Sequence, residues 1–409
     1  MIELEHSPLG GSSAKRFMTC AGSFLKQREA ILDGTFEDIP TEFAEIGTAA
    51  HELGAICLAT DTEPFEYLGE TFNGYRAGWE GELGLDAVQV YVNECRAVMD
   101  LCDYDGLAVV EKTYKAPHLH KLLKGTVDFG YLSPSRGLFL RDYKNGEGVA
   151  VSVVNNFQLL YYAFLMLVDS EATQFGEENW TADTPVNLGI VQPNYYGIFE
   201  DVETWIVTVD FVWNWGHKVL LPEMHRLYEA GMTIRDSDFV PGDHCQFCPV
   251  LLECPVMQRA FKEYADASED FITMLTNEEL DHLYSQREYA RRFMTALERV
   301  VYARKIAGGN IASAKLVEPM TARVWKPGAE AQLKATFGEK AYAPRKVLSP
   351  AAIEKLSSRG KELALEYGFK PDANRLTIAP LSDRRPEAKP RTNATVFEAH
   401  AQSPQDMGF

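Results

Sequence analysis

The segment GTVDFGYLSPSRGLFLRDYK, residues 125–144, constrains the fold most, because it places charged residues within strands that are otherwise apolar. Two alternating apolar runs flank the turn sequence SPSRG and predict a β-hairpin. Asp128 and Asp142 would then lie at similar heights on paired strands, and the two-residue period would put Lys144 on the same face as Asp142. Unpaired buried charge is costly. A divalent metal ion held by both aspartates, with the lysine beside it, would offset that cost.

The composition is that of an ordinary soluble protein. Of the 409 residues, 46% are hydrophobic and 24% are charged, and the length predicts two or three structural units. No apolar run reaches membrane-spanning length, and the N-terminus lacks the features of a signal peptide, so we expect a cytoplasmic protein with no membrane partner. Seven cysteines in such a chain argue against a disulfide scaffold and favour metal or cluster binding by a subset.

The net charge of −19 is unevenly distributed along the chain. Residues 29–105 hold 18 Asp and Glu against two Arg, a balance of −16, whereas residues 280–350 hold 13 Lys and Arg against six acids, a balance of +7. The acidic part has a simple interpretation as a solvated face. A nucleic acid would instead meet a basic surface, with the 280–350 segment as one candidate and the first helix as the other. The cations of that helix are Lys15, Arg16, Lys26 and Arg28.

The order of predicted elements places the chain in the α/β class, with helices first, then a cluster of strands, then helices on the sheet. The expected helices cover about 14–32, 41–59, 85–102, 155–168, 211–230, 255–264 and 276–307, and the expected strands cover 107–114, the 125–144 hairpin, 186–192 and 205–209. Three regions follow: a main domain over 1–270, a mainly helical region over 271–378, and a tail over 379–409 whose composition predicts disorder.

Three motifs occur in order within 38 residues: Gly125-x-x-Asp128, Asp142-x-Lys144 and Gln158-x-x-x-Tyr162. Phosphodiester cleavage needs carboxylates that hold Mg²⁺ or Mn²⁺, charge stabilisation at the phosphate and a positioned water, and this set supplies such groups. Gln158 and Tyr162 share one face of the predicted helix. The purely structural alternative is an ion pair between one aspartate and Lys144 at the end of a sheet.

A histidine and three cysteines complete the candidate residues. His51 follows small residues on a predicted helix and precedes Glu52, although a lone helical histidine is more often a core or surface residue than a ligand. The spacing Cys245-x₂-Cys248-x₅-Cys254 indicates a metal or cluster site. Cys20 is the candidate for the fourth ligand, and the spacing alone leaves a four-cysteine zinc site open. Cys57, Cys95 and Cys102 lie on apolar helix faces and are expected in the core.

These motifs together resemble those of PD-(D/E)xK nucleases of the RecB type, and the split cysteines resemble the subgroup that carries a [4Fe–4S] cluster. More narrowly, the chain looks like an uncharacterised family common in phages and prophages. The resemblance covers most of residues 10–260 and a patch at 382–387. It rests on the stretches SSAKRFMTCAGS, GTAAHELG, GTVDFGYL, FLRDYKNGEG, HCQFCPVLLECP and SDRRPE.

The resemblance implies a restriction-endonuclease-like core, a central mixed sheet flanked by helices, with a cysteine-cluster staple and a helical C-terminal extension. It implies His51, Asp128 and Asp142 as ligands of Mg²⁺ or Mn²⁺, with the Tyr143 carbonyl as a further one. Lys144 would orient or activate water, and Gln158 and Tyr162 would position the DNA strand or the lysine. Cys20, Cys245, Cys248 and Cys254 would hold the [4Fe–4S] cluster. Asp142 departs from the glutamate of many relatives, and Glu52 and Glu111 rank second as added acids.

The sequence therefore predicts a metal-dependent DNA exonuclease. By resemblance, it would act in phage recombination or replication beside a single-strand-binding or annealing protein. The rival hypothesis is a non-catalytic DNA-binding or assembly protein that retains the nuclease core. Cleavage polarity, strand preference, iron against zinc, and oligomeric state stay open.

Overall fold

A computed structural model gives the structure of the chain and describes residues 7–36, 42–78, 83–146, 150–169, 180–194, 202–229, 234–266 and 275–316. The chain divides into two compact units, Met1–Leu316 and Val317–Phe409. Every described residue belongs to the first unit. The predicted tail over 379–409, the patch at 382–387 and most of the predicted 271–378 region therefore lie outside the described residues.

The first unit contains a mixed five-stranded sheet in the order β4-β5-β6-β7-β8. All neighbouring strands are antiparallel except β6 and β7, which are parallel. The strands are β4 Leu107–Lys115, β5 Lys124–Ser133, β6 Gly137–Tyr143, β7 Pro185–Val191 and β8 Val202–Thr208. The predicted 125–144 hairpin is confirmed as β5 and β6, and the α/β class is confirmed with it.

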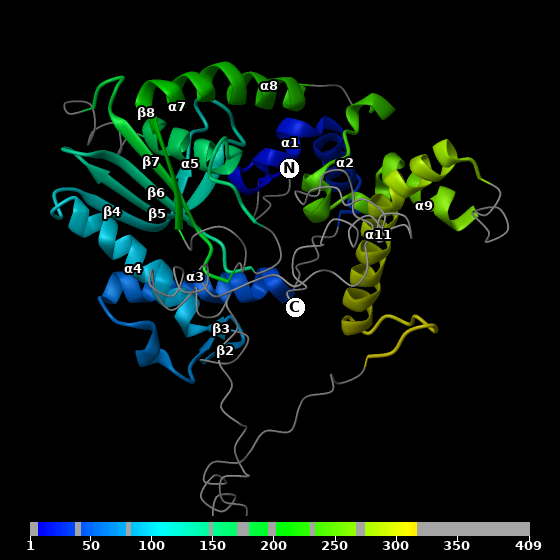
Figure 1. Cartoon of the computed structure of the whole chain (residues 1–409), viewed down its shortest axis with the longest axis horizontal. Helices are drawn as coiled ribbons and strands as arrows, with labels where there is room; N and C mark the ends of the chain where they lie inside the picture. The colour runs from blue at the N-terminus through cyan, green and yellow to red at the C-terminus, as the bar shows by residue number, and fades with distance from the viewer. Residues whose placement is uncertain are drawn as a thin grey trace, which may run out of the picture. The chain divides into compact units, whose positions relative to one another are not determined.

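Helices cover both faces of this sheet (Figure 1). One face packs against α5 (Phe157–Val168), with α7 (Val209–Trp215) and α8 (Leu221–Glu229) beyond it. The other packs against α3 (Glu42–Thr60) and α4 (Leu85–Leu101). Small strands β1 Thr71–Phe72, β2 Tyr75–Gly78 and β3 Leu83–Gly84 form a separate three-stranded sheet. We refer to the two sides as the α5 face and the α3 face.

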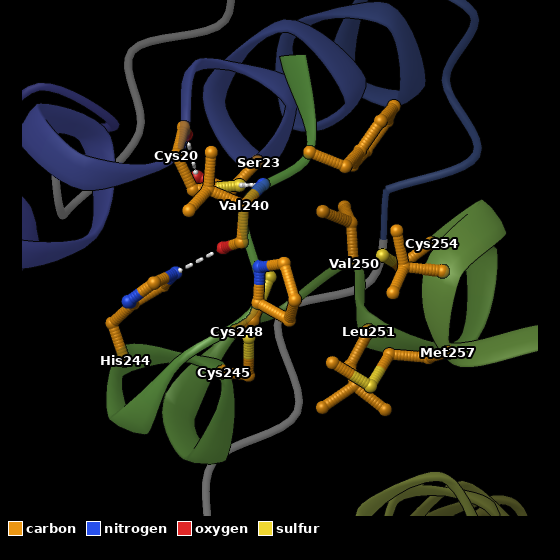
Figure 2. Close-up of a pocket in the computed structure, with 13 residues that line it drawn as sticks. Cys20, Ser23, Val240, His244, Cys245, Cys248, Val250, Leu251, Cys254 and Met257 are labelled. Carbon is orange, nitrogen blue, oxygen red and sulfur yellow. Dashed lines mark hydrogen bonds between the residues drawn. The ribbon is translucent and has the colours of Figure 1, made fainter. Parts of the chain in front are cut away.

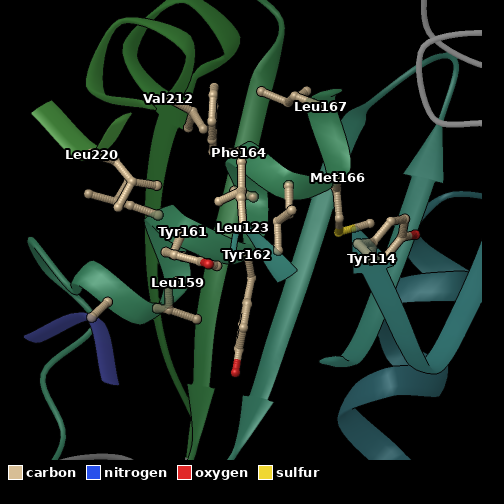
Figure 3. Packing of buried hydrophobic residues seen from close by; sticks show 14 of the residues in the cluster. Tyr114, Leu123, Leu159, Tyr161, Tyr162, Phe164, Met166, Leu167, Val212 and Leu220 are labelled. Atoms are coloured by element: carbon tan, nitrogen blue, oxygen red, sulfur yellow. The ribbon is translucent and has the colours of Figure 1, made fainter. Parts of the chain in front are cut away.

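Helix α5 is the centre of the larger core (Figure 3). The side chain of Asn156 caps its N-terminus by accepting from the backbone N–H groups of Gln158 and Leu159. Residues 159–168 are all buried, so this helix is apolar on every side. Both the sheet and the N-terminal segment cover this helix, which explains why it has no polar side. The contact with the N-terminal segment includes a hydrogen bond of 2.9 Å from the Tyr161 hydroxyl to the Leu9 carbonyl.

Two predicted helices are interrupted. The expected 14–32 helix is split into α1 (Ala14–Thr19) and α2 (Ala21–Leu32) at Cys20, whose backbone is extended at φ −132° and ψ 93°. The expected 211–230 helix is α7, the π-helical turn η3 (Gly216–Leu220) and α8. Short 3₁₀ turns are η1 Gly11–Ser13, η2 Pro64–Tyr67, η4 Asp236–Asp238, η5 Asp243–Phe247 and η6 Leu251–Glu253.

After the cysteines the chain forms α9 (Pro255–Asp266) and α11 (Asn277–Ile306). The predicted capping box at the start of the long helix is confirmed, because Thr276 and Glu279 exchange side-chain-to-backbone hydrogen bonds. The rings of Phe261 and Phe293 stack at 4.7 Å, so α11 packs on α9 within the first unit. Across the described residues, no helix is both long enough and apolar enough to cross a membrane.

Candidate functional site

Strands β5 and β6 separate at one point, and the predicted site residues lie there. Their ladder ends at the pair Phe129–Arg141, whereas β6 stays paired with β7 as far as Tyr143. Asp128 and Asp142 are the first residues past the last β5–β6 pair, and we call this place the strand fork. The backbone N–H of Tyr143 donates to Asp128 Oδ2 over 2.7 Å, so the buried Asp128 carboxylate spans the opening between the strands.

Three ligand-type side chains meet on one side of the fork. His51 from α3 places Nδ1 2.9 Å from Glu111 Oε1 and 3.8 Å from Asp128 Oδ2. Ligand atoms of these three residues all lie within 4.8 Å of one another. An imidazole nitrogen and two carboxylates form a donor set suited to Mn²⁺ or Mg²⁺.

Glu111 is held in a strained backbone conformation. Its φ is +45°, in the left-handed region that ordinary side chains rarely adopt. The β4–β5 pairing passes from Val110–Phe129 to Lys112–Val127, so Glu111 stands opposite Asp128 where the ladder is interrupted. Such strain, on the order of 1 kcal/mol, tends to persist where a site requires it. Here its result is a carboxylate directed at His51.

A second network joins the other predicted residues on the α5 side. Lys144 Nζ lies 2.7 Å from Asp142 Oδ2 and donates to Gln158 Oε1 over 3.2 Å. The Gln158 amide nitrogen in turn donates to Asp142 Oδ1 over 2.9 Å and to the Tyr162 hydroxyl over 3.3 Å. One glutamine therefore fixes the carboxylate, the ammonium and the phenol together.

Two glycines make room for Tyr162, whose hydroxyl extends away from the apolar cluster in Figure 3. A Cβ at Gly125 would lie 2.7 Å from the Tyr162 ring, and a Cβ at Gly11 would lie 2.2 Å from it. Any larger residue at either position would push the ring aside. The glycine of the Gly125-x-x-Asp128 motif is thus explained by the close approach of α5 to β5.

Burial and neighbouring charges together shift the pKa values of the titratable residues at the fork. Burial raises the pKa of Asp142 to about 6, although Lys144 opposes the shift. Burial also raises the pKa of Asp128. For Lys144 and His51, burial acts to lower the pKa, but the carboxylates outweigh it, so the Lys144 pKa rises and the His51 pKa reaches about 9. Without an ion, protonated His51 is therefore the cation between Glu111 and Asp128.

The structure brings six predicted residues together at the fork: His51, Asp128, Asp142, Lys144, Gln158 and Tyr162. The backbone N–H of Tyr143 donates to Asp128 at the fork, and the centre of the Tyr143 ring stacks 4.6 Å from that of Tyr91. Of the second-ranked acids, Glu52 is exposed, whereas Glu111 is part of the site. The sequence analysis ranked Glu111 second, although Glu111, like Asp128, is a carboxylate inside an apolar strand (LAVVEKTYK).

The four predicted cluster cysteines line one pocket (Figure 2). Cys20 reaches it because the chain is extended there between α1 and α2, and its sulfur accepts from the backbone N–H of Val240 over 3.4 Å. Cys245, Cys248 and Cys254 come from the η5 and η6 turns. The remaining lining is mainly apolar, with residues such as Val250 and Met257.

The spacing of these thiols bears on what they could hold. Among the described residues, no three of the four sulfurs come within 4.8 Å of one another. A single tetrahedral zinc with bonds near 2.3 Å requires sulfurs about 3.8 Å apart. The four thiols are a ligand set for either a zinc ion or a [4Fe–4S] cluster. Burial raises the pKa of Cys248 to about 11, with Arg16 acting against the shift.

The cations of the first helix are largely engaged within the fold. Arg16 is buried and donates to Gln27 over 3.1 Å. Lys26 pairs with Glu29 at 2.5 Å, and Arg28 donates to the Tyr228 carbonyl over 2.9 Å. These contacts tie α1 and α2 to their surroundings, whereas Lys15 is exposed, and the DNA surface expected on this segment stays a prediction. Cys57, Cys95 and Cys102 are buried in the core of the α3 face, as predicted.

Comparison with known proteins places the chain in a family. No solved structure matches it. The family of proteins of unknown function DUF2800 matches residues 6–386, which include both the strand fork and the cysteine pocket. The match spans far more than half of the 409 residues. The chain therefore belongs to the DUF2800 family.

Proposed function

We propose that the chain is a divalent-metal-dependent deoxyribonuclease with a PD-(D/E)xK-type core, acting as an exonuclease. The observation that carries the proposal is the convergence of a histidine, carboxylates and a lysine at the strand fork. They come from three separate elements, α3, the β4–β5 ladder and the end of β6. A simple ion pair at the end of a sheet would need only Asp142 and Lys144, and leaves the strained Glu111 and the half-buried His51–Asp128 contact unexplained.

The donor set fits Mg²⁺ or Mn²⁺. His51, Glu111 and Asp128 would hold the ion, and Asp142 lies on the other side of the fork. When bound, the ion would polarise a phosphodiester and lower the pKa of a water. Since the His51 imidazole must be neutral to bind a metal, the ion would replace its proton.

The remaining residues act on the substrate and on each other. Lys144 stays charged because Asp142 and Asp128 raise its pKa, so its ammonium is available to a phosphate oxygen or to the attacking water. Gln158 holds Lys144 and Asp142 in one arrangement, and Tyr162 holds Gln158. Catalysis of phosphoryl chemistry depends on such positioning, and a network already formed before substrate arrives avoids reorganisation.

We further propose that Cys20, Cys245, Cys248 and Cys254 hold a [4Fe–4S] cluster with a structural role. The support is the shared pocket, the sequence spacing Cys245-x₂-Cys248-x₅-Cys254 and the separation of Cys20 from the other three by more than 200 residues. Phosphodiester hydrolysis transfers no electrons, so the cluster is not needed for the reaction. Action in phage recombination or replication beside a single-strand-binding or annealing protein belongs to the same proposal and rests on the resemblance.

The test is cleavage of end-labelled linear DNA with Mn²⁺ by the full chain. Wild type should degrade the DNA and should leave covalently closed circles intact. Asp142→Asn should be inactive, and Asp281→Asn, which alters an exposed carboxylate on α11, should behave as wild type. A wild-type preparation that loads Mn²⁺ but cleaves no DNA would favour the rival, a DNA-binding or assembly protein that retains the core.

A further inference from the structure

Two lysines face each other at the far end of the β4–β5 ladder. The cross-strand register pairs Lys115 with Lys124, and the preceding pair on the same face of the sheet is Thr113 with Thr126, whose hydroxyls lie 2.8 Å apart. Like charges directly opposite on paired strands destabilise a sheet. The pair concentrates positive charge at this end of the ladder, where an anionic group can bind.

These pairs project from the α3 face. Tyr114 and Val127 are buried in the core of the α5 face, and a Cβ at Gly125 would meet Tyr162 of α5. Because neighbouring strand residues point to opposite faces, both threonines and both lysines point to the side of the sheet from which His51 reaches the fork. Thr113 and Lys115 are exposed there.

The two cross-strand pairs and the opposed residues Glu111 and Asp128 at the break in the ladder therefore form one row. Glu111 and Asp128 at the fork are followed by the hydroxyl pair and then by the lysine pair. Four residues of antiparallel strand separate Asp128 from Lys124, which is about 14 Å of backbone. That distance corresponds to about two to four nucleotides of a nucleic-acid strand, depending on how extended the strand is.

We propose that Lys115 and Lys124 form a phosphate-binding subsite for the DNA strand that is cut at the fork. The hydroxyl pair between them and the ion can donate to an intervening phosphate. The subsite stands on rigid structure, because the Tyr161 hydroxyl of the buried helix α5 donates to the Lys124 carbonyl over 3.3 Å. This subsite rests on the proposed nuclease function. It places the part of the DNA strand next to the cleaved bond along the β4–β5 ladder.

The test compares DNA binding by three full-length proteins: wild type, the double variant Lys115→Gln/Lys124→Gln, and Lys112→Gln. Lys112 is a matched control because it lies on the same strand but toward the opposite face, with its ammonium 5.1 Å from the centre of the Tyr114 ring. Fluorescence anisotropy of labelled DNA is recorded from about 50 to about 200 mM salt without divalent ions, so that nothing is cleaved. A DNA too short to span the distance to the lysines serves as a second probe.

The double variant should bind long DNA on the order of tenfold more weakly, with a salt slope reduced by about two, one for each lost phosphate contact. Its melting temperature should stay near the wild-type value, and this excludes misfolding as the cause. Lys112→Gln should match wild type, and the short DNA should not discriminate between the proteins. An unchanged slope in the double variant, or an equal loss in Lys112→Gln, overturns the subsite.

The two proposals fail separately. A wild type that cleaves DNA while the double variant keeps its salt slope refutes the lysine subsite alone. A wild type that shows lysine-dependent binding but no cleavage with Mn²⁺ refutes the nuclease and supports the subsite. A wild type that binds no DNA overturns both.

Discussion

The strand fork and the cysteine pocket are both groups of metal-ligand residues, but they are assembled differently. At the fork the side chains are already joined to one another, through contacts such as His51–Glu111 and Lys144–Asp142. In the pocket the thiols come from segments more than 200 residues apart and are surrounded mainly by apolar side chains. The fork can therefore keep its shape without an ion, whereas the pocket would depend on the proposed cluster to hold its segments together.

This contrast separates activity from folding. A substitution at the fork should change chemistry while the fold survives, because the core on either side of the sheet is untouched. A substitution in the pocket should release the link between the N-terminal helices and the η5–η6 segment, and activity should be lost as a consequence. The following predictions test that separation.

The largest effect is expected for Cys20→Ala. Free energy of structural metal binding is also folding free energy, on the order of 10 kcal/mol, so the variant should lose the cluster, solubility and activity together. Iron content, visible absorption and soluble yield after anaerobic purification measure this. The control is Cys95→Ala, a buried core cysteine on α4, which should cost only about 1 kcal/mol of packing. A soluble, active Cys20→Ala protein would contradict the proposed structural role of the cluster.

Lys144→Met should reduce cleavage on the order of a hundredfold or more, because it removes the ammonium that Asp142 and Gln158 hold in place. The iron content and melting temperature should stay near the wild-type values. Turnover with saturating Mn²⁺ is the measurement. Loss of iron in this variant would show that the strand fork and the cysteine pocket are coupled, and would contradict the separation of activity from folding.

Glu111→Asn should move stability and metal affinity in opposite directions. Asparagine tolerates the left-handed backbone better, so the free energy of unfolding should rise by about 0.5–1 kcal/mol. Mn²⁺ affinity should fall by roughly tenfold to a hundredfold, because a carboxylate is lost from the site. Glu111→Gln is the matched control, with the charge removed and the strain kept, and it should lose affinity without gaining stability.

The smallest effect concerns a buried histidine outside both regions. Burial, with His225 and Lys121 nearby, lowers the pKa of His120 from its ordinary 6.5 to about 4. The unfolded chain therefore takes up a proton that the folded chain does not, so stability is full above about pH 6.5 and declines as the pH falls toward 4. Urea unfolding at pH 7.5 and pH 5 should show a loss on the order of 1 kcal/mol that His120→Gln lacks. The exposed His118 supplies the control variant His118→Gln, which should keep the dependence.

Local patterns in the sequence predicted the elements and most of the fork. Alternation identified β5 and β6, and the order of the motifs identified Lys144, Gln158 and Tyr162 as neighbours. A single extended residue does not disturb the helical periodicity of a sequence, so the break at Cys20 was not predicted. That break directs the Cys20 thiol to the pocket. The internal partners of two cations of the first helix, Gln27 for Arg16 and the Tyr228 carbonyl for Arg28, could not be predicted for a similar reason, because they depend on packing.

The role of Glu111 could not be ranked correctly from the sequence. Strand periodicity predicts that residues at positions 109 and 114 point to opposite faces, yet Val109 and Tyr114 are buried in the same core cluster. The interruption of the ladder at Glu111 and Asp128 produces this change of side, and it is a property of the paired strands rather than of either sequence. The same interruption gives the fork its third ligand.

The most direct test of the account is Mn²⁺ binding and iron content measured on the same samples of wild type and Asp128→Asn. Electron paramagnetic resonance of free Mn²⁺ gives the binding isotherm, and elemental analysis gives the iron. Asp128→Asn should lose Mn²⁺ binding at the fork and keep its iron. Undiminished Mn²⁺ binding in Asp128→Asn would contradict the metal site at the strand fork, and with it the proposed chemistry.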